Sequence, residues 1–311
     1  MIDQDDRIVV IGGVSVDIGG RAFKPLVARD SNPGQVSVSL GGVGRNIAHN
    51  LSLLGCRVSF LSGLGGDGYS DDIRRSCAEL GIDLSLSLTV PDSPTSTYLY
   101  LEDCTGELAL AVIDTRLCER ITPDYLAPRM DRINRAQLVF ADANLNADTL
   151  AYLAAHCTAP IFSDPVSTAK AVRIKPILRS LHTVKPNRIE AELLTGITIT
   201  DDQSLEAAAS ALLATGLRRA FITLGSEGVY AAEGEKRVHL PPTPMHLVST
   251  NGAGDAFTAA LGWAYLNGME LEQTCRAASA AAAVAAESAS TINPLLSASA
   301  VTARMSLTDN R

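Results

Sequence analysis

The 311-residue sequence is poor in positive charge and in cysteine. It has 26 basic against 34 acidic residues, a formal net charge of −8, which argues against nucleic acid as a partner. Its six cysteines form no CxxC pair and are too sparse for a disulfide scaffold, so we expect them to be reduced. Its five histidines show no metal-ligand spacing.

Long apolar runs are also missing. Even the most apolar region, 256–290, holds no window of about 18 uncharged apolar residues, so we expect no membrane partner. The first residues, MIDQDDR, carry acids where an export signal carries positive charge. We therefore expect a cytoplasmic protein, and with 46% hydrophobic residues it can bury a substantial core.

Short β-rich apolar runs alternate with helical patterns, which predicts an α/β fold built from parallel βαβ units. Ligands of such sheets bind at the carboxyl ends of the strands. The alanine-rich segment 277–289 is predicted to be a packing helix. The apolar runs lie at 8–13, 57–64, 136–143, 160–165 and 219–225.

Two stretches, 19–41 and 95–113, interrupt this alternation, and the second has the pattern of a β-hairpin. Since both follow parallel strands, we predict that they pair into a small sheet over the strand ends, as a lid. The predicted boundaries are 17–41 and 95–113 for the lid, and 1–16, 42–94 and 114–311 for the large α/β domain.

The segment STNGAGDAFTAALGWA (249–264) combines two glycines with a following helical pattern. The amides of Ala253, Gly254 and Asp255 would lie at a helix N-terminus, where an anion is favoured. Asp255 could equally be an ordinary helix cap.

Other polar motifs are weaker. No GxxxxGK[ST] motif occurs, which excludes a Walker P-loop, whereas the GxGxxG pattern at 63–68 leaves a dinucleotide site conceivable. Asn187 and Glu190 share one helical face and could hold hydrated Mg²⁺ or form a helix cap. TLGSEGVY (223–230) could bind phosphate on its amides or form a tight hairpin. Asp17, at a strand end, could bind two hydroxyls or be solvated.

Together, these motifs resemble the ribokinase-like (PfkB) carbohydrate kinase family in their order and approximate spacing over nearly the whole chain. The resemblance implies a three-layer α/β/α sandwich with a mostly parallel central sheet and a β-sheet lid. It also implies an ATP-dependent kinase for a primary hydroxyl of a sugar or nucleoside. The motifs are Asp17, GGVGRN (41–46), PNRIE (186–190), TLGSEG (223–228) and NGAGDAF (251–257).

The resemblance also implies roles for single residues. Asp255 matches the catalytic base, and Ser249 stands where the family usually has an aspartate, so use of a monovalent cation such as potassium stays open. The other implied roles are the anion hole for Gly252, Ala253 and Gly254, sugar binding for Asp17, Gly42 and Asn46, ATP binding for Asn187, Thr223, Gly225 and Gly228, and Mg²⁺ binding through water for Glu190.

Within the family, the stretches 28–55, 141–146, 164–170 and 182–192 are most similar to the pseudouridine kinases, which implies phosphorylation of the 5′-hydroxyl of pseudouridine. Alternatives are another nucleoside, a free sugar such as ribose, or a sugar-binding regulator on the same fold. The resemblance leaves a homodimer through the lid open. The residues expected to read the base are Ser31, Asn32, Thr95, Ser96 and Lys170, for which turn chemistry and β-propensity are the alternatives.

Overall fold

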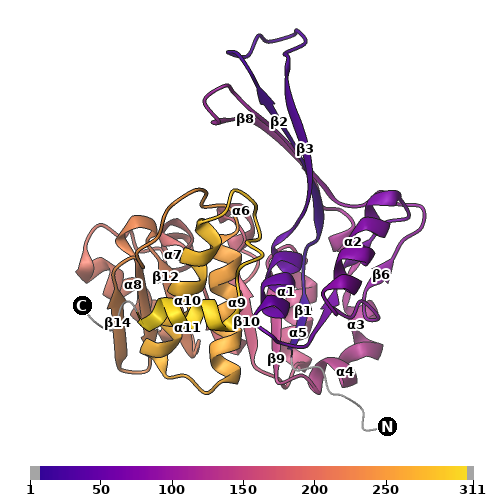
Figure 1. Cartoon of the computed structure of the whole chain (residues 1–311). Coiled ribbons are helices and arrows are strands. Elements are labelled where there is room, and N and C mark those ends of the chain that lie inside the picture. The colour runs from indigo at the N-terminus through magenta and orange to yellow at the C-terminus, as the bar shows by residue number, and fades with distance from the viewer. Residues whose placement is uncertain (1–7, 307–311) are drawn as a thin grey trace.

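An eight-stranded sheet forms the centre of the molecule, whose computed structural model describes residues 8–306 (Figure 1). The strand order is β14-β13-β12-β11-β10-β9-β1-β4, and the six strands from β12 to β4 are parallel. Strands β13 and β14 add antiparallel pairs at one edge. The strands are β1 (Ile8–Ile11), β4 (Val58–Leu61), β9 (Leu138–Asp142), β10 (Ile161–Asp164), β11 (Thr183–Val184), β12 (Arg219–Thr223), β13 (Val229–Glu233) and β14 (Lys236–Leu240).

Helices cover both faces of this sheet because its strands are apolar on both sides. Along β1, Ile8 and Val10 belong to one buried cluster, and Val9 and Ile11 belong to the other. The first cluster also holds residues of α1 (Val43–Leu53), α2 (Gly68–Glu79), α9 (Ala253–Leu266), α10 (Leu271–Ala286) and α11 (Ala298–Ser306). The second holds residues of α3 (Pro123–Leu126), α4 (Met130–Asn134), α5 (Ala147–His156), α6 (Thr168–Ala171), α7 (Arg188–Thr195) and α8 (Asp202–Ala214).

This three-layer arrangement confirms the expected fold class, and all five predicted apolar runs contain strands of the central sheet. Helix α11 and strand β14 were not predicted. None of the helices between residues 8 and 306 is long and apolar enough to cross a membrane. The short 3₁₀ helices are Cys118–Arg120, Ala127–Arg129, Lys175–Ser180 and Gly225–Glu227.

A separate four-stranded sheet, the lid, projects from the body (Figure 1). Its order is β3-β2-β7-β8, in which β2 pairs antiparallel with β3 and parallel with β7. The sheet begins at Ser15 and ends at Asp114, slightly beyond the predicted lid, and the division into domains stays a prediction. Its strands are β2 (Ser15–Ala22), β3 (Gly34–Gly41), β7 (Thr97–Glu102) and β8 (Leu108–Asp114), and a further small pair joins β5 (Gly63–Leu64) and β6 (Leu88–Thr89).

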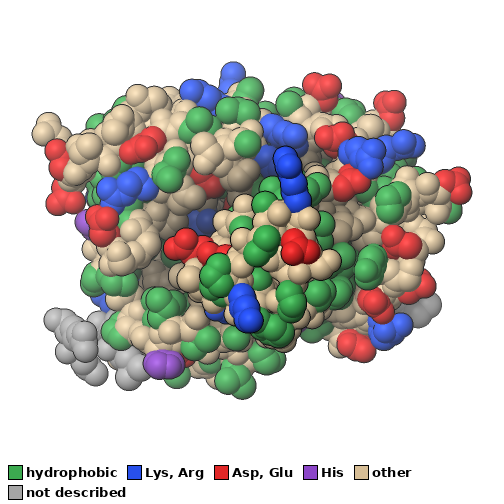
Figure 2. Space-filling model, turned by 90° about the horizontal axis from the view of Figure 1, so that it is seen from above, with side chains coloured by type: hydrophobic (Ala, Val, Ile, Leu, Met, Phe, Trp, Pro, Cys, Tyr) green, Lys and Arg blue, Asp and Glu red, His purple; other side chains and the backbone are tan. Residues whose placement is uncertain are grey.

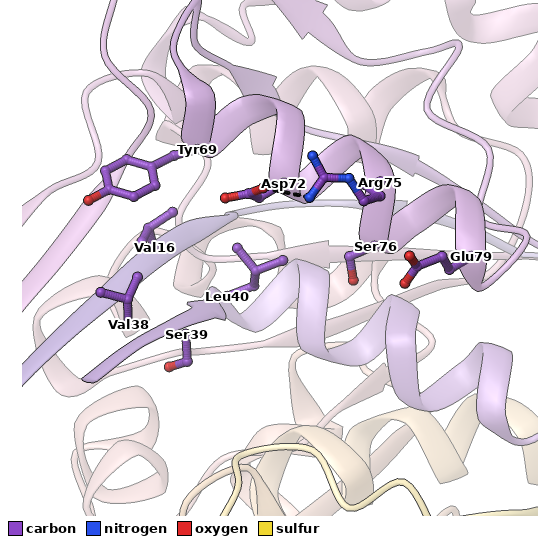
Figure 3. Close-up of a pocket in the computed structure, with 9 residues that line it drawn as sticks. All are labelled: Val16, Val38, Ser39, Leu40, Tyr69, Asp72, Arg75, Ser76 and Glu79. Atoms are coloured by element: carbon purple, nitrogen blue, oxygen red, sulfur yellow. Dashed lines mark hydrogen bonds and ion pairs between the residues drawn. The ribbon is translucent and has the colours of Figure 1, made fainter.

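The two faces of the lid differ in chemistry. One face, here called the outer face, is apolar. Strand pairing places on it Val36 and Val38 of β3, Ile18 of β2, Leu99 of β7 and Val112 of β8. At its root, a groove of about 370 Å³ separates it from α2 (Figure 3). The outer face therefore points toward α2, and the opposite, inner face points away from it. The groove is lined by Val16, Val38, Ser39 and Leu40 of the lid and by Tyr69, Asp72, Arg75, Ser76 and Glu79 of α2.

Candidate active site

Polar side chains gather where the central strands end. Asp142 ends β9, Asp164 ends β10, and Lys185 directly follows β11. Asp142 is buried and accepts hydrogen bonds from the amides of Gly13 and Asn144, each at 2.9 Å. Sequence reasoning missed these three charged residues as site residues. The signal that could have found them is a polar residue at the end of a buried apolar strand.

The N-terminus of α9 faces the same edge. Gly252 caps the helix at φ +77°, and a Cβ there would lie 1.9 Å from the carbonyl oxygen of Thr291, so only glycine fits. The amide of Ala253 already donates to Thr250 at 3.3 Å. The anion-hole role expected for Gly252, Ala253 and Gly254 stays a prediction. The amides of Gly254 and Asp255 make no hydrogen bond within residues 8–306.

Asp255 is held by a residue far away in the chain. Asn46 of α1 donates from Nδ2 to Asp255 Oδ2 at 2.9 Å. Burial, followed by the negative charge of Asp164, raises the pKa of Asp255 to about 7, although the Asn46 bond and the cation of Lys185 oppose this shift. A carboxylate that titrates near neutral pH is suited to act as a general base.

An ion pair lies beside Asp255. Lys185 Nζ is 3.2 Å from Asp164 Oδ2, and both side chains are buried. Burial lowers the pKa of Lys185, but the charges of Asp164 and Glu190 outweigh it and leave the pKa above its ordinary value. Thr258, one turn into α9, donates to Asp164 at 2.9 Å. The pair therefore keeps a cation next to the helix N-terminus, 3.7 Å from where a Cβ of Gly254 would be.

The predicted sugar-binding residues come from the lid and α1. Asp17 accepts a hydrogen bond from Ser15 Oγ at 2.8 Å, and burial raises its pKa against the effects of that bond and of Arg45. Gly42 has φ +92°, and a Cβ there would lie 2.6 Å from Val14 Cα. The close approach of the backbone at Val14 therefore accounts for a glycine at position 42 without any contact to a ligand. Sugar contacts for Asp17, Gly42 and Asn46 stay predictions.

Asn187 and Glu190 form a reciprocal capping box at the start of α7. The Asn187 amide donates to Glu190 Oε2, and the Glu190 amide donates to Asn187 Oδ1, each at 2.9 Å. Glu190 is nevertheless buried, and its Oε1 makes no hydrogen bond within the described residues. No cluster of three or more His, Cys, Asp or Glu residues in the described chain could hold a metal. The arrangement fits Mg²⁺ only as a hydrated ion with few protein ligands.

A cavity of about 640 Å³ joins the predicted nucleotide residues to the helix N-terminus. Thr223, Gly225 and Gly228 line it, and so do Ala253 and Gly254. Sequence reasoning treated the alanine-rich segment as packing only, which is incomplete because three of its alanines line this cavity. The apolar lining residues are Val229, Pro242, Pro244, Met245, Leu247, Phe257, Ala282, Ala283 and Ala286.

The five expected base-reading residues have different local partners, and their roles stay predictions. Ser31 and Asn32 are exposed in the loop between β2 and β3, where Asn32 Oδ1 accepts from the Val27 amide at 2.8 Å, as turn chemistry predicts. Thr95 and Ser96 are buried, and Thr95 donates from both its amide and its hydroxyl to Asp67. Lys170 Nζ donates to Asn144 Oδ1 at 2.6 Å.

Ser249, at the position that left cation use open, lies just before this helix N-terminus. Its amide donates to the carbonyl oxygen of Ala286 at 3.1 Å. Its hydroxyl oxygen accepts a hydrogen bond from the Asn251 amide at 3.2 Å. Ser249 therefore stabilises the turn that leads into α9.

Known proteins resemble the chain over nearly its whole length. The sequence profile of the pfkB family carbohydrate kinase matches residues 5–298. A pseudouridine kinase of Escherichia coli is 36% identical over 94% of this chain and 95% of its own. An uncharacterized sugar kinase of the same organism, YeiI, is 37% identical over 96% and 83%. The structure of Arabidopsis thaliana ribokinase complexed with ribose and ATP has a TM-score of 0.87 at 22% identity and covers 96% of this chain and 98% of its own.

The site geometry predicts how Asp255 titrates. We expect the Asp255 carboxyl to titrate near pH 7, and we expect Asp164→Asn to lower this pKa because it removes a neighbouring negative charge. Lys185→Met should raise it, because a neighbouring positive charge is lost. Carbon-13 NMR of aspartate-labelled protein measures these pKa values, with Asp255→Asn assigning the signal.

Asp72→Asn is the matched control, since Asp72 pairs with Arg75 on the surface. It should leave the Asp255 pKa unchanged. A wild-type pKa close to the ordinary 3.8 would contradict the interpretation.

Proposed function

Because the chain belongs to the PfkB family of carbohydrate kinases, we propose that it transfers the γ-phosphoryl group of ATP to the 5′-hydroxyl of pseudouridine. The observation that carries the proposal is Asp255, which lies at the N-terminus of α9 and is hydrogen bonded to Asn46. Asp255 follows Gly254, which lines the 640 Å³ cavity, and Asn46 belongs to α1, which begins directly after lid strand β3 and Gly42. The E. coli relative named pseudouridine kinase supports the choice of acceptor.

The residues around Asp255 provide what phosphoryl transfer needs, which is alignment and charge neutralisation. Asp17 and Asn46 orient the ribose so that its 5′-oxygen attacks the γ-phosphorus, and Asp255 accepts the hydroxyl proton. The bond from the γ-phosphorus to the bridging oxygen breaks, and ADP leaves. The amides of Gly254 and Asp255, together with Lys185 beside them, would stabilise the negative charge that develops on the transferred group.

The 640 Å³ cavity is the proposed ATP site. Its apolar walls suit the adenine ring, and its end at Ala253 and Gly254 leads the phosphates to the helix N-terminus. Asn187, Thr223, Gly225 and Gly228 would contact the nucleotide. When bound, Mg²⁺ held through water by Glu190 would neutralise phosphate charge. The lid would exclude water from the reacting groups.

A second candidate acceptor is another nucleoside or a free sugar such as ribose. The support for it is that YeiI, named a sugar kinase, is as similar to this chain as the pseudouridine kinase is. A sugar-binding regulator fits the site less well, because binding alone does not need a carboxylate whose pKa is raised to about 7.

We also propose a homodimer through the outer face of the lid. Val36, Leu110 and Val112 on this face are 71%, 61% and 60% exposed, and apolar neighbours extend the patch across the sheet. Contiguous exposed apolar surface of this kind is typical of an interface. A second copy of the same face is apolar as well and would cover it in an isologous contact.

We expect Asp255→Asn to leave nucleoside binding nearly intact and to lower turnover by about 10²- to 10⁴-fold, because the general base is lost. Steady-state kinetics at saturating MgCl₂ and calorimetric titration with nucleoside measure the two effects. Turnover within a few-fold of wild type would reject this role for Asp255.

A substrate panel tests the acceptor. We expect kcat/KM for pseudouridine to exceed that for uridine by about tenfold or more. A polar group of the site that accepts a hydrogen bond from the extra ring N–H of pseudouridine has no partner when uridine is bound. Coupled ADP release with pseudouridine, uridine, adenosine and ribose measures it. Equal efficiency on the two uracil nucleosides would overturn pseudouridine specificity, and activity on ribose alone would overturn the nucleoside assignment.

For the dimer, Leu110→Lys combined with Val112→Lys should convert the protein to a monomer, because charges would be buried in an apolar contact. Light scattering after size-exclusion chromatography measures the mass. Leu295→Lys, at a residue that is 75% exposed outside the lid, is the control and should change nothing. A wild-type monomer at tens of micromolar would contradict the proposal.

A further inference from the structure

The inner face of the lid carries two tyrosines that the proposed mechanism does not use. They come from β7, whose sequence TYLYLE alternates tyrosine with leucine. Because successive side chains of a strand point to opposite faces, Leu99 and Leu101 lie on the outer face and Tyr98 and Tyr100 lie on the inner face.

The rings lie flat on the sheet. A Cβ at Gly19 would come within 2.5 Å of Tyr100 Cζ, which places that ring directly over the β2 backbone. Its hydroxyl lies close to Ser37 of β3, the residue that pairs with Gly19. Tyr98 stacks on Tyr100 with ring centroids 5.3 Å apart and an interplanar angle of 27°. Only a glycine at position 19 leaves room for this arrangement.

The ring pair adjoins the proposed ribose-binding carboxylate. Asp17 pairs in register with Tyr98, so both side chains lie on the inner face, and the negative charge of Asp17 acts on the Tyr100 hydroxyl. Both tyrosines are half-buried and keep part of their surface open. Seen from above, the molecular surface is hollowed beside the projecting lid (Figure 2).

We propose that Tyr98 and Tyr100 form a stacking platform for the base of a nucleoside whose ribose is held by Asp17. This inference rests on the proposed nucleoside kinase function. Stacking between a base and an aromatic side chain is favourable and depends little on which base is bound, because every base has a π-face. The platform therefore favours nucleosides over free ribose and does not by itself distinguish pseudouridine from uridine. The platform assigns base stacking to β7, and the base-reading roles expected for Ser31, Asn32, Thr95, Ser96 and Lys170 stay predictions.

The test compares the two faces of one strand. We expect Tyr98→Ala and Tyr100→Ala each to raise the KM and the calorimetric Kd for pseudouridine and uridine alike by about 5- to 100-fold, with the KM for ATP unchanged. Tyr98→Phe and Tyr100→Phe keep the rings and should stay within a few-fold of wild type. Leu99→Ala, between the tyrosines but on the outer face, is the matched control and should leave nucleoside affinity unchanged.

The outcomes separate this inference from the proposed function. If wild-type protein phosphorylates a nucleoside and the alanine variants keep its Kd, the platform is wrong and the function stands. If wild-type protein phosphorylates ribose and binds no nucleoside, the nucleoside kinase function and the platform both fail. Loss of ATP affinity in the tyrosine variants would also overturn the platform, since it would indicate a change in the body of the protein.

Discussion

The candidate active site depends on one constraint, which is that three carboxylates share one edge of the sheet with the buried cation of Lys185. Burying charges is costly unless they are paired or hydrogen bonded. Asp142 is satisfied by backbone amides, and Asp164 is satisfied by Lys185 and Thr258. Asp255 has only the Asn46 amide as a side-chain partner within the described chain, and its pKa is accordingly raised to about 7. The least satisfied carboxylate is the one proposed to take the proton.

Small residues create the space in which this chemistry can occur. Gly252 lets α9 begin against the backbone at Thr291, and the alanines of α10 leave an open wall in the proposed ATP cavity. At Gly254 a Cβ would meet only Lys185 Nζ within 4 Å. A larger residue at Gly252 would displace the helix N-terminus, whereas Gly254 leaves the approach to its amides open.

Alternate residues of each lid strand lie on opposite faces of the sheet, and we propose a different role for each face. Its outer face exposes aliphatic side chains that suit a second lid, and its inner face carries Asp17, Tyr98 and Tyr100. Because the period is 2, a register shift of one residue would exchange the two sets. The proposed substrate recognition and the proposed association through the lid would then both be lost, because both depend on the same strand pairing.

The sequence by itself determined the features that arise within a few residues. Apolar periodicity predicted the parallel strands, and the glycines around Asp255 predicted a helix N-terminus. The spacing of Asn187 and Glu190 allowed either a helix cap or a Mg²⁺ site, and the structure shows that the two residues form a capping box. Contacts between distant segments were decided only by the tertiary structure. Asn46 and Asp255 are 209 residues apart, and no local pattern signals that one amide will hold the other's carboxylate. The face on which Tyr98 lies depends likewise on pairing with β2, because alternation alone does not say which side meets the site.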